Sequence, residues 1–567
     1  MASIEEESLD ISFSNLIQIA LARTQDGFVP NFASSFHVSY DRTEPQIGAY
    51  VTLQIYKKWG AARAGWLVDT VLDALLEWQD WTWRKRRGEG SLATADGHAD
   101  LIVLGSDPNA APGGTVGGAN TLQAARYESG LDNSPMYDGN DACDAAAGPV
   151  CFDKNGTHHM TLYDVGMSGL FLSDTAALLE LAAARGRADV LPQLQARYDR
   201  VAAATAAHLW APGAGPAGAF ANVLYNGSFY ARLSPTSFFP LISGAATPAQ
   251  AAATAALAAS PLGFCLDTGY TPDASAAALV QWFGGGHDNA PCVTDACLRD
   301  TVNAKYRFIR VEGVPLLPAA GAAPGRVPLN LWYSAARGDY AMTNSSAPPE
   351  PSGYAFVRQE GWCFDAPPSS AAAGRTWNTT RLTSWFSAAR KDYQVCGTAN
   401  CLADVAKGYV FTGDLCYAFA GETAADLPCK FGGNSIVRGD EAFWDNNYWR
   451  GRIWGPHLQL IYWALAHPSY RDMPAVAAAR TALVAQGRRL VEQEWSLFRQ
   501  VTENYNGVIG VGEDVGNADP FCACGARRGA GGAEGARAAP YLPLYLLPPD
   551  HWGALAGFLS FLEAGAY

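Results

Sequence analysis

The feature that most constrains the fold is an internal repeat in the middle of the chain. Residues 329–340 read LNLWYSAARGDY, and residues 382–393 repeat them as LTSWFSAARKDY. A weaker copy, LVQWFGGGHDN, comes first at residues 279–289. A period of about fifty residues indicates one structural unit copied three times, and aromatic, β-branched and Gly-rich sequence favours short strands. We therefore expect a β-rich insertion over residues 270–434, of trefoil-like or otherwise pseudo-threefold form.

The aromatic and Cys residues of these repeats each have two interpretations. Aromatics at matching positions are interpreted as the repeated core, and the alternative is a sugar-binding surface. Two copies carry a C-x4-C segment after the repeated Asp, Cys292/Cys297 and Cys396/Cys401, which could close equivalent loop disulfides. Zinc is the alternative for paired Cys, but the spacings form no two C-x2-C hooks with nearby His. We therefore expect no metal.

The sequence on either side of the repeats is typical of helices. Ser173 and Asp174 can cap a helix that ends at Gly186, and Pro192 and Pro474 each precede a further apolar stripe at helical spacing. Two helices joined by a short turn form an antiparallel hairpin. Helical hairpins at both ends of a long chain suggest a toroid or a solenoid.

The chain is long enough for one large catalytic domain and a smaller unit. We expect residues 1–269 and 435–567 to form one mainly α domain that the β-rich insertion interrupts. Residues 522–550 form an Ala/Gly/Arg low-complexity insertion. A last apolar stripe follows at residues 555–562.

Charge and motifs exclude several kinds of partner and reaction. The formal net charge of -14 argues against nucleic acid, because a phosphate backbone is bound by clustered Lys and Arg. The one basic run, residues 84–87, is interpreted as a solvated helix end. The sequence contains no GxxxxGK[ST], GxSxG or HExxH motif. Abundant Trp and Tyr instead suit a neutral sugar, which aromatic faces and carboxylates bind.

Signals of the cellular compartment conflict. No apolar run approaches the roughly 20 residues that span a bilayer, so no membrane span is expected, and the acidic start does not resemble an export signal. The Cys pairs and four N-x-[ST] sequons, at Asn155, Asn226, Asn344 and Asn378, nevertheless suit an oxidising secretory compartment. A missing N-terminal segment would reconcile the two.

Two loops offer the carboxylate pair that hydrolysis of an acetal requires, one acid and one base. In ESGLDNSPMYD, residues 128–138, Gly130 ends a helix and Pro135 prevents an immediate restart. We therefore expect Asp132 and Asn133 at a loop apex, and the alternative is an Asx-turn in which Asp132 binds its own backbone. Glu503 begins ENYN in a Gly-rich loop, where by itself it would be interpreted as an exposed loop residue.

A third segment places four large side chains directly before a helix. NNYWRGRIWGPHLQL begins at Asn446 and carries Trp449, Arg450, Arg452 and Trp454 ahead of a Gly-Pro junction. These side chains can face a cavity at the helix start. The alternative for one of each kind is a core Trp and an Arg in a structural ion pair.

Taken together, these segments resemble glycoside hydrolase family 63, which includes processing α-glucosidase I and mannosylglycerate hydrolases. The resemblance covers most of residues 10–265 and 436–567. It is carried by DGFVPNF at 26–32, ESGLDNSPMYD at 128–138, YWRGRIWGP at 448–456 and ENYN at 503–506. Family members usually have a WD-containing segment ahead of the first barrel helix, and this sequence begins after it.

The resemblance implies an (α/α)6 barrel and an inverting mechanism, with Asp132 as general acid and Glu503 as general base. Arg42, in YDRTEPQIGA, becomes a plausible substrate contact. The other expected contacts are Asn133, Asp138, Trp449, Arg450, Arg452, Trp454 and Tyr505.

The expected activity is hydrolysis of an α-linked hexose, of the mannosyl-oligosaccharide glucosidase type. Alternatives are a mannosylglycerate hydrolase, a trehalase-like enzyme and a non-catalytic carbohydrate-binding relative. No cofactor is expected, because side chains perform both proton transfers.

Overall fold

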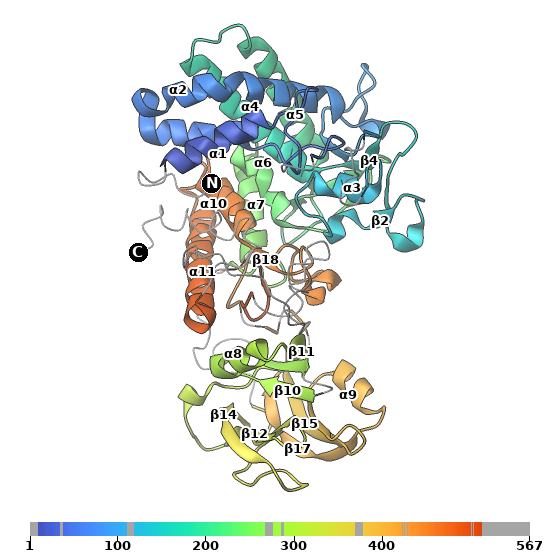
Figure 1. The fold of residues 1–567 in the computed structure, drawn as a ribbon, viewed down its shortest axis with the longest axis vertical. Helices are drawn as coiled ribbons and strands as arrows, with labels where there is room; N and C mark the ends of the chain where they lie inside the picture. Colours follow the sequence, from blue (N-terminus) through green and yellow to red (C-terminus); the bar gives the residue numbers. More distant parts are fainter. Residues whose placement is uncertain are drawn as a thin grey trace, which may run out of the picture.

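The computed structural model separates a helical body from a strand-rich unit along its longest axis (Figure 1). It describes residues 9–33, 38–109, 118–266, 276–284, 288–368, 378–421, 423–424, 426–427, 429–499, 502 and 504–512. Glu503, the low-complexity tract and the last apolar stripe lie outside these residues.

The helical body is built from both flanks of the repeats. Its helices are α1 (Leu9–Leu21), α2 (Gly48–Lys85), α3 (Leu122–Tyr127), α4 (Val165–Ala184), α5 (Leu191–His208), α6 (Phe239–Ile242), α7 (Pro248–Ala259), α10 (Gly455–Ala466) and α11 (Pro474–Phe498). One apolar core runs from Phe13 to Tyr505 and includes side chains from α2, α4, α10 and α11. The two flanks therefore fold as a single body, in which α4 packs on α5 and α10 on α11.

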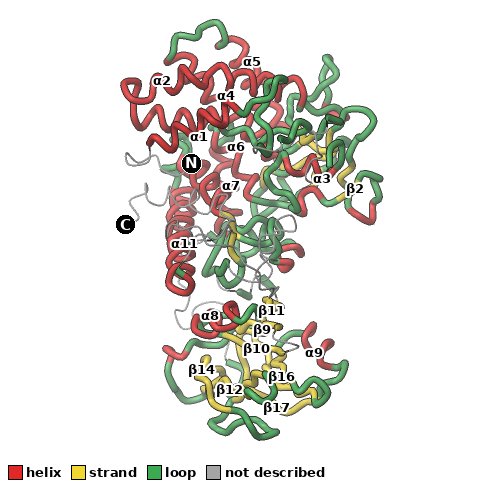
Figure 2. The backbone as a smooth tube through the Cα atoms, in the orientation of Figure 1, coloured by secondary structure: helices red, strands yellow, loops and turns green. Residues whose placement is uncertain are grey.

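Short strands are also part of this body. They are β1 (Val103–Gly105), β2 (Gly139–Asn140), β3 (Val150–Cys151), β4 (His159–Tyr163), β5 (Trp210–Ala211), β6 (Ala219–Phe220), β7 (Asn222–Leu224), β8 (Phe229–Tyr230), β18 (Ile453–Trp454) and β19 (Asn504–Tyr505). Figure 2 shows how loops dominate the region around these strands.

Helix starts follow the Pro signals but not the predicted Asp cap. Helix α5 has Pro192 in its first turn, and α11 begins at Pro474, as predicted. Helix α4 begins earlier than predicted, because Asp164 caps it by accepting from Met167 N at 2.7 Å. Asp174 lies in the middle of α4 and accepts from the backbone N–H groups of Ala49 and Tyr50 at 2.7 and 3.0 Å. It satisfies the free N–H groups at the start of a different helix, α2.

Residues 84–87 are only in part the solvated helix end that the sequence suggested: Arg84 and Lys85 end α2 and are exposed, whereas Arg86 and Arg87 are buried. Each buried guanidinium faces carboxylates, Arg86 that of Glu128 and Arg87 that of Asp96. Carboxylates elsewhere in the sequence thus hold Arg86 and Arg87 inside the helical body.

Helix α4 is also long and apolar enough to cross a bilayer, contrary to the expectation that no such segment exists. It has 20 residues, and 83% of its most apolar window is buried inside the protein. Burial of this kind is typical of a core helix. Among the described residues it is the single helix that meets the criteria of length and composition.

Each copy of the repeat contributes three antiparallel strands to the strand-rich unit. The first gives β9 (Leu279–Gly284), β10 (Asp288–Cys292) and β11 (Arg307–Gly313); the second gives β12 (Arg326–Ser334), β13 (Asp339–Thr343) and β14 (Ala355–Phe364); the third gives β15 (Thr379–Ser387), β16 (Asp392–Cys396) and β17 (Val410–Phe419). The first copy forms a three-stranded sheet of order β10-β9-β11, and the others form a six-stranded sheet of order β13-β12-β14-β17-β15-β16.

The repeated Asp residues meet where the second strands of the copies converge. Strands β10, β13 and β16 contact one another in every pairing. One carboxylate oxygen each from Asp288, Asp339 and Asp392 lie within 4.8 Å of one another. Asp288 accepts from Tyr340 N at 3.2 Å, Asp339 from Tyr393 N at 3.0 Å, and Asp392 from Asn289 N at 2.9 Å. The bonds run in a cycle from copy to copy, which gives the unit a pseudo-threefold axis.

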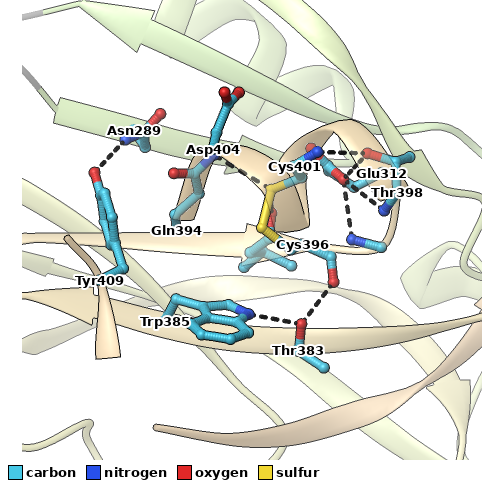
Figure 3. The surroundings of a disulfide bond; sticks show 12 residues. Asn289, Glu312, Thr383, Trp385, Gln394, Cys396, Thr398, Cys401, Asp404 and Tyr409 are labelled. Atoms are coloured by element: carbon cyan, nitrogen blue, oxygen red, sulfur yellow. Dashed lines mark hydrogen bonds between the residues drawn. A yellow bond between two sulfur atoms is a disulfide. The ribbon is translucent and has the colours of Figure 1, made fainter. Parts of the chain in front are cut away.

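A buried Glu in one copy also caps the loop of another. Glu312 Oε2 accepts from Gly397 N at 2.9 Å and Thr398 N at 3.1 Å, at the start of α9 (Ala399–Val405) (Figure 3). Glu360 Oε2 does the same for Val293 N and Thr294 N, at the start of α8 (Asp295–Asn303). Neither short helix was expected from the sequence. These carboxylates supply the acceptors that the free N–H groups of a helix start require.

Disulfides support both the repeats and their connection to the helical body. The predicted pairs Cys292–Cys297 and Cys396–Cys401 are bonded, together with Cys143–Cys151, Cys363–Cys416 and Cys265–Cys429. The last pair spans 164 positions of sequence and joins the two chain segments on either side of the strand-rich unit.

The repeated aromatics form the expected repeated core only in part. Trp282 and Trp332 are buried, as a repeated core requires. Phe356 and Phe411 are about half exposed, and each packs edge-on against the Trp of its own copy.

Candidate active site

The predicted acidic loop, residues 128–138, lies between the capped helix α3 and a capped 3₁₀ turn. Helix α3 ends at Tyr127, and Gly130 turns the chain with φ +70°, a conformation that favours Gly. Asp132 follows, partly exposed, and its backbone carbonyl accepts from Gln123 Nε2 at 2.9 Å. Pro135 then begins a 3₁₀ turn (Pro135–Tyr137), so it does not prevent a restart. The fixed φ of proline suits the first position of such a turn.

Glu128 anchors the loop in the interior. Its carboxylate accepts from Arg86 Nε at 2.9 Å, from Thr43 N at 2.9 Å and from Gly105 N at 2.7 Å. Both side chains of the ion pair are fully buried. Glu128, the obvious substitute for Asp132 as an acid, is therefore occupied by structural bonds.

The segment that begins at Asn446 forms a two-stranded ribbon with the ENYN segment. In the antiparallel pair of β18 and β19, Trp454 lies opposite Asn504 and Ile453 opposite Tyr505. Arg452 is fully buried beside them and donates to Asn504 Oδ1. Tyr505 is buried as well, and its hydroxyl accepts from Thr502 N at 3.2 Å.

Trp449 and Trp454 stack on each other in front of α10. Their ring centroids are 3.7 Å apart and their planes 11° from parallel. Both rings are nearly buried. His457 packs against Trp449, and burial lowers the pKa of His457 to about 3, so its imidazole is neutral near pH 7.

Asn133 connects the acidic loop to this ribbon. Its Oδ1 accepts from Trp449 N at 2.8 Å, and its Nδ2 donates to Asn447 O at 3.3 Å. Near them, Arg450 pairs with Asp138 at 3.1 Å, and Arg232 pairs with the same carboxylate at 2.9 Å. Residues 133 and 449 are 316 positions apart in sequence and meet here.

The YDRTEPQIGA loop lies against the other side of the acidic loop. Arg42 is buried, pairs with Asp41 at 2.9 Å and stacks over the Tyr127 ring at 4.7 Å. Asn31 accepts from Arg42 Nε at 3.3 Å and donates to Glu44 Oε2 at 3.1 Å. Burial, together with the neighbouring charge of Asp132, raises the pKa of Glu44 to about 8 against the opposing hydrogen bond from Asn31.

The described residues thus bring most of the predicted positions together. Those gathered around the acidic loop and the ribbon are Arg42, Asp132, Asn133, Asp138, Trp449, Arg450, Arg452, Trp454 and Tyr505. Arg42, Arg452 and Tyr505 are buried among protein groups. Asn31 and Glu44 were not singled out, although both lie in the motifs DGFVPNF and YDRTEPQIGA.

A family model described as the mannosylglycerate hydrolase MGH1-like glycoside hydrolase domain matches residues 15–283, which include Asp132, Asn133 and Glu44. Residues 15–283, slightly less than half of the chain, are therefore similar to this glycoside hydrolase family, in agreement with the resemblance to family 63. Among curated proteins, none matches the sequence.

Solved structures that align with parts of the chain come from Thermus thermophilus. An uncharacterized conserved protein aligns over 88% of this chain and 83% of its own, with 12% identity and a TM-score of 0.42. A GH63 mannosylglycerate hydrolase in complex with Tris aligns over 90% of this chain and 87% of its own, with 13% identity and a TM-score of 0.41. The same hydrolase with glucose aligns over 44% and 65%, with 16% identity and a TM-score of 0.32.

Proposed function

We propose that the chain is an inverting glycosidase that hydrolyses a small α-glycoside, foremost a hexose joined to a hydroxy acid as in mannosylglycerate. The match of residues 15–283 to a family named for mannosylglycerate hydrolase carries this proposal. It favours the small α-glycoside over the oligosaccharide of a mannosyl-oligosaccharide glucosidase.

In this proposal Asp132 is the general acid and Glu503 the general base. Asn133, next to Asp132, binds Trp449, and Asn504, next to Glu503, pairs with Trp454. The rings of Trp449 and Trp454 stack on each other. The residues next to Asp132 and Glu503 therefore both contact this Trp pair. Inversion requires the carboxyl groups to lie roughly 6.5–9.5 Å apart, so that a water molecule fits between the base and the sugar.

The remaining residues divide by burial into two proposed roles. Asp138 and Arg450 are partly exposed and would contact substrate hydroxyl groups, as would Asn133. Arg42, Arg452 and Tyr505 are buried and would hold the loops in place. The Trp pair would form one wall of the sugar site.

We further propose that the helices complete an (α/α)6 toroid interrupted at residues 270–434. The hairpins α4/α5 and α10/α11 and their shared core support this arrangement.

The test is hydrolysis by the purified protein of α-mannosylglycerate, α-glucosylglycerate, trehalose and an α-glucosidic oligosaccharide. The anomer released is followed by NMR before mutarotation. We expect β-mannose or β-glucose from an α-glycoside, and a kcat lower by about 10²–10⁴-fold in the Asp132→Asn variant. Release of the α-anomer would refute inversion. No turnover of any substrate, with sugar binding retained, would leave the chain as a binding relative.

A further inference from the structure

A tight turn at residues 446–450 contacts both the acidic loop and the segment 504–512, which begins within ENYN. Asn446 and Tyr448 adopt left-handed conformations, with φ of 45° and 55°. Asn447 and Arg450 exchange two backbone hydrogen bonds of 3.0 Å, which close the turn. Asn tolerates the left-handed region better than most residues other than Gly. Asn446 therefore suits the backbone of this turn.

The Asn446 side chain binds the segment 504–512 through both groups of its amide. Its Nδ2 donates to Asn506 Oδ1 at 2.8 Å, and its Oδ1 accepts from Gly507 N at 2.9 Å. Asn506 Oδ1 also accepts from Val508 N at 3.0 Å and from Ile509 N at 3.2 Å, so it needs donors on every side. Asn446 and Asn506 are both buried. The position of Asn446 thus requires one donor and one acceptor on the same side chain.

The backbone of the same turn binds the acidic loop. Trp449 N donates to Asn133 Oδ1 at 2.8 Å, and Asn133 Nδ2 donates to Asn447 O at 3.3 Å. Asn133 directly follows Asp132 in the sequence. The residue after Asp132 and the residues at the end of ENYN are therefore both hydrogen-bonded to one short turn.

The spacing of two catalytic carboxyl groups matters for inversion, because a water molecule must fit between the base and the sugar. A displacement of about 1 Å in a reacting group can slow catalysis by about 10²-fold. Groups on loops that are distant in sequence keep such a spacing only if a rigid element supports both. The turn at residues 446–450 has the hydrogen bonds of such a support.

We propose that Asn446 is a positioning residue that fixes the segment 504–512 relative to the acidic loop, and with it the spacing of the acid and the base. The catalytic roles of Asp132 and Glu503 rest on the proposed function. Asn446 takes no part in proton transfer, because both groups of its amide bind protein atoms. Its loss should slow the chemical step without weakening the binding of the sugar.

The first experiment measures kcat and KM of Asn446→Gly on a substrate that the wild type hydrolyses. Glycine adopts the left-handed backbone at no steric cost, so this variant removes only the amide. We expect kcat to fall by about 10²-fold and KM to stay within about twofold of wild type. A variant with the kcat of wild type, or with a raised KM alone, would overturn the inference while leaving the proposed function intact.

Two further variants separate positioning from folding. Asn446→Asp keeps the shape of the side chain and the acceptor for Gly507 N, but it places an oxygen against Asn506 Oδ1. Its kcat should fall as well, and it replaces Asn446→Gly if that variant does not fold. Gln486→Ala removes another buried amide, which donates to Cys265 O at 2.8 Å. It should lower the unfolding midpoint and leave kcat close to wild type; an equal loss of kcat there would overturn the inference.

The second experiment needs no turnover, and so separates this inference from the proposed function. Hydrogen–deuterium exchange with mass spectrometry measures the protection of backbone amides in peptides that cover residues 128–138 and 504–512. We expect Asn446→Gly to speed exchange in both peptides, because one turn holds both, and Gln486→Ala to speed it in neither. If Asn446→Gly changes the peptide 504–512 alone, the turn does not couple the two loops, and the inference is wrong whether or not the protein hydrolyses any glycoside.

Discussion

The substitution Glu128→Gln tests whether the buried ion pair holds the acidic loop. The Glu128 carboxylate accepts from Arg86 at 2.9 Å, from Thr43 N at 2.9 Å and from Gly105 N at 2.7 Å, and it is fully buried. Glutamine preserves the shape of the side chain but removes the charge. It also places an NH₂ group where one of these donors needs an acceptor.

The expected loss is large because Arg86 stays buried without a counter-charge. Breaking a buried ion pair from one side costs about 3–5 kcal/mol, and an unsatisfied backbone N–H costs about 1–3 kcal/mol more. Denaturant unfolding near neutral pH, followed by Trp fluorescence, measures the loss. Trp81, whose ring lies 4.6 Å from the Arg86 guanidinium, reports the change locally.

Two control variants interpret the result. Asp96→Asn removes the partly exposed partner of Arg87 and should change the unfolding midpoint much less. The double variant Arg86→Met with Glu128→Leu removes both buried charges and should recover much of the lost stability. If Glu128→Gln unfolds at the same denaturant concentration as wild type, the pair does not anchor the loop.

Three further results are expected. Asp132→Asn should lower kcat by about 10²–10⁴-fold, as for loss of a general acid, with an unchanged unfolding midpoint; a variant that retains activity would reassign the acid. Burial raises the pKa of Asp339 above its ordinary value, so the folded strand-rich unit binds a proton that the unfolded chain releases near pH 3.9. Its stabilising effect is complete below that pH and is lost as the pH rises through the raised pKa. The unfolding midpoint should therefore fall between about pH 4 and about pH 6, and Asp339→Asn should flatten this dependence; an identical slope in both proteins would refute the assignment. Replacing Cys265 and Cys429 together by Ser should lower the free energy of unfolding by about 2–5 kcal/mol. If instead heat denaturation of the double variant matches wild type, the crosslink does not contribute to stability.

Local signals predicted much of the fold because they depend on neighbouring residues. Pro192 and Pro474 mark helix starts, and the repeats predict short strands within residues 270–434, where β9 to β17 lie. The prediction that Asp174 caps its own helix was wrong, because its hydrogen-bonding partner Tyr50 lies 124 positions away in sequence. Arg86 was wrongly predicted to be exposed, because a basic run by itself indicates solvent exposure. Its buried partner Glu128 is distant in sequence.

The site was predictable to the level of its loops. The order of Gly130, Asp132 and Pro135 predicted a turn with an acid near its apex, and Asp132 is partly exposed there. The contact of Asn133 with Trp449 could not be predicted, because a packed body brings those loops together. Glu44 was missed because its raised pKa arises from tertiary burial and from Asp132, neither of which the local sequence reveals.

Capping links the three copies of the repeat in one direction, because the helix in one copy is capped by a carboxylate from another copy. The position of Glu312 and Glu360 is taken in the third copy by Leu415, and the loop it would cap, in the second copy, has neither a C-x4-C segment nor a helix. Asn344 of that loop instead donates to the Leu415 carbonyl at 2.6 Å. The acid is missing in one copy, and the helix that it would cap is missing in another. Grafting the helix into the second copy would therefore require a carboxylate at position 415 in the third.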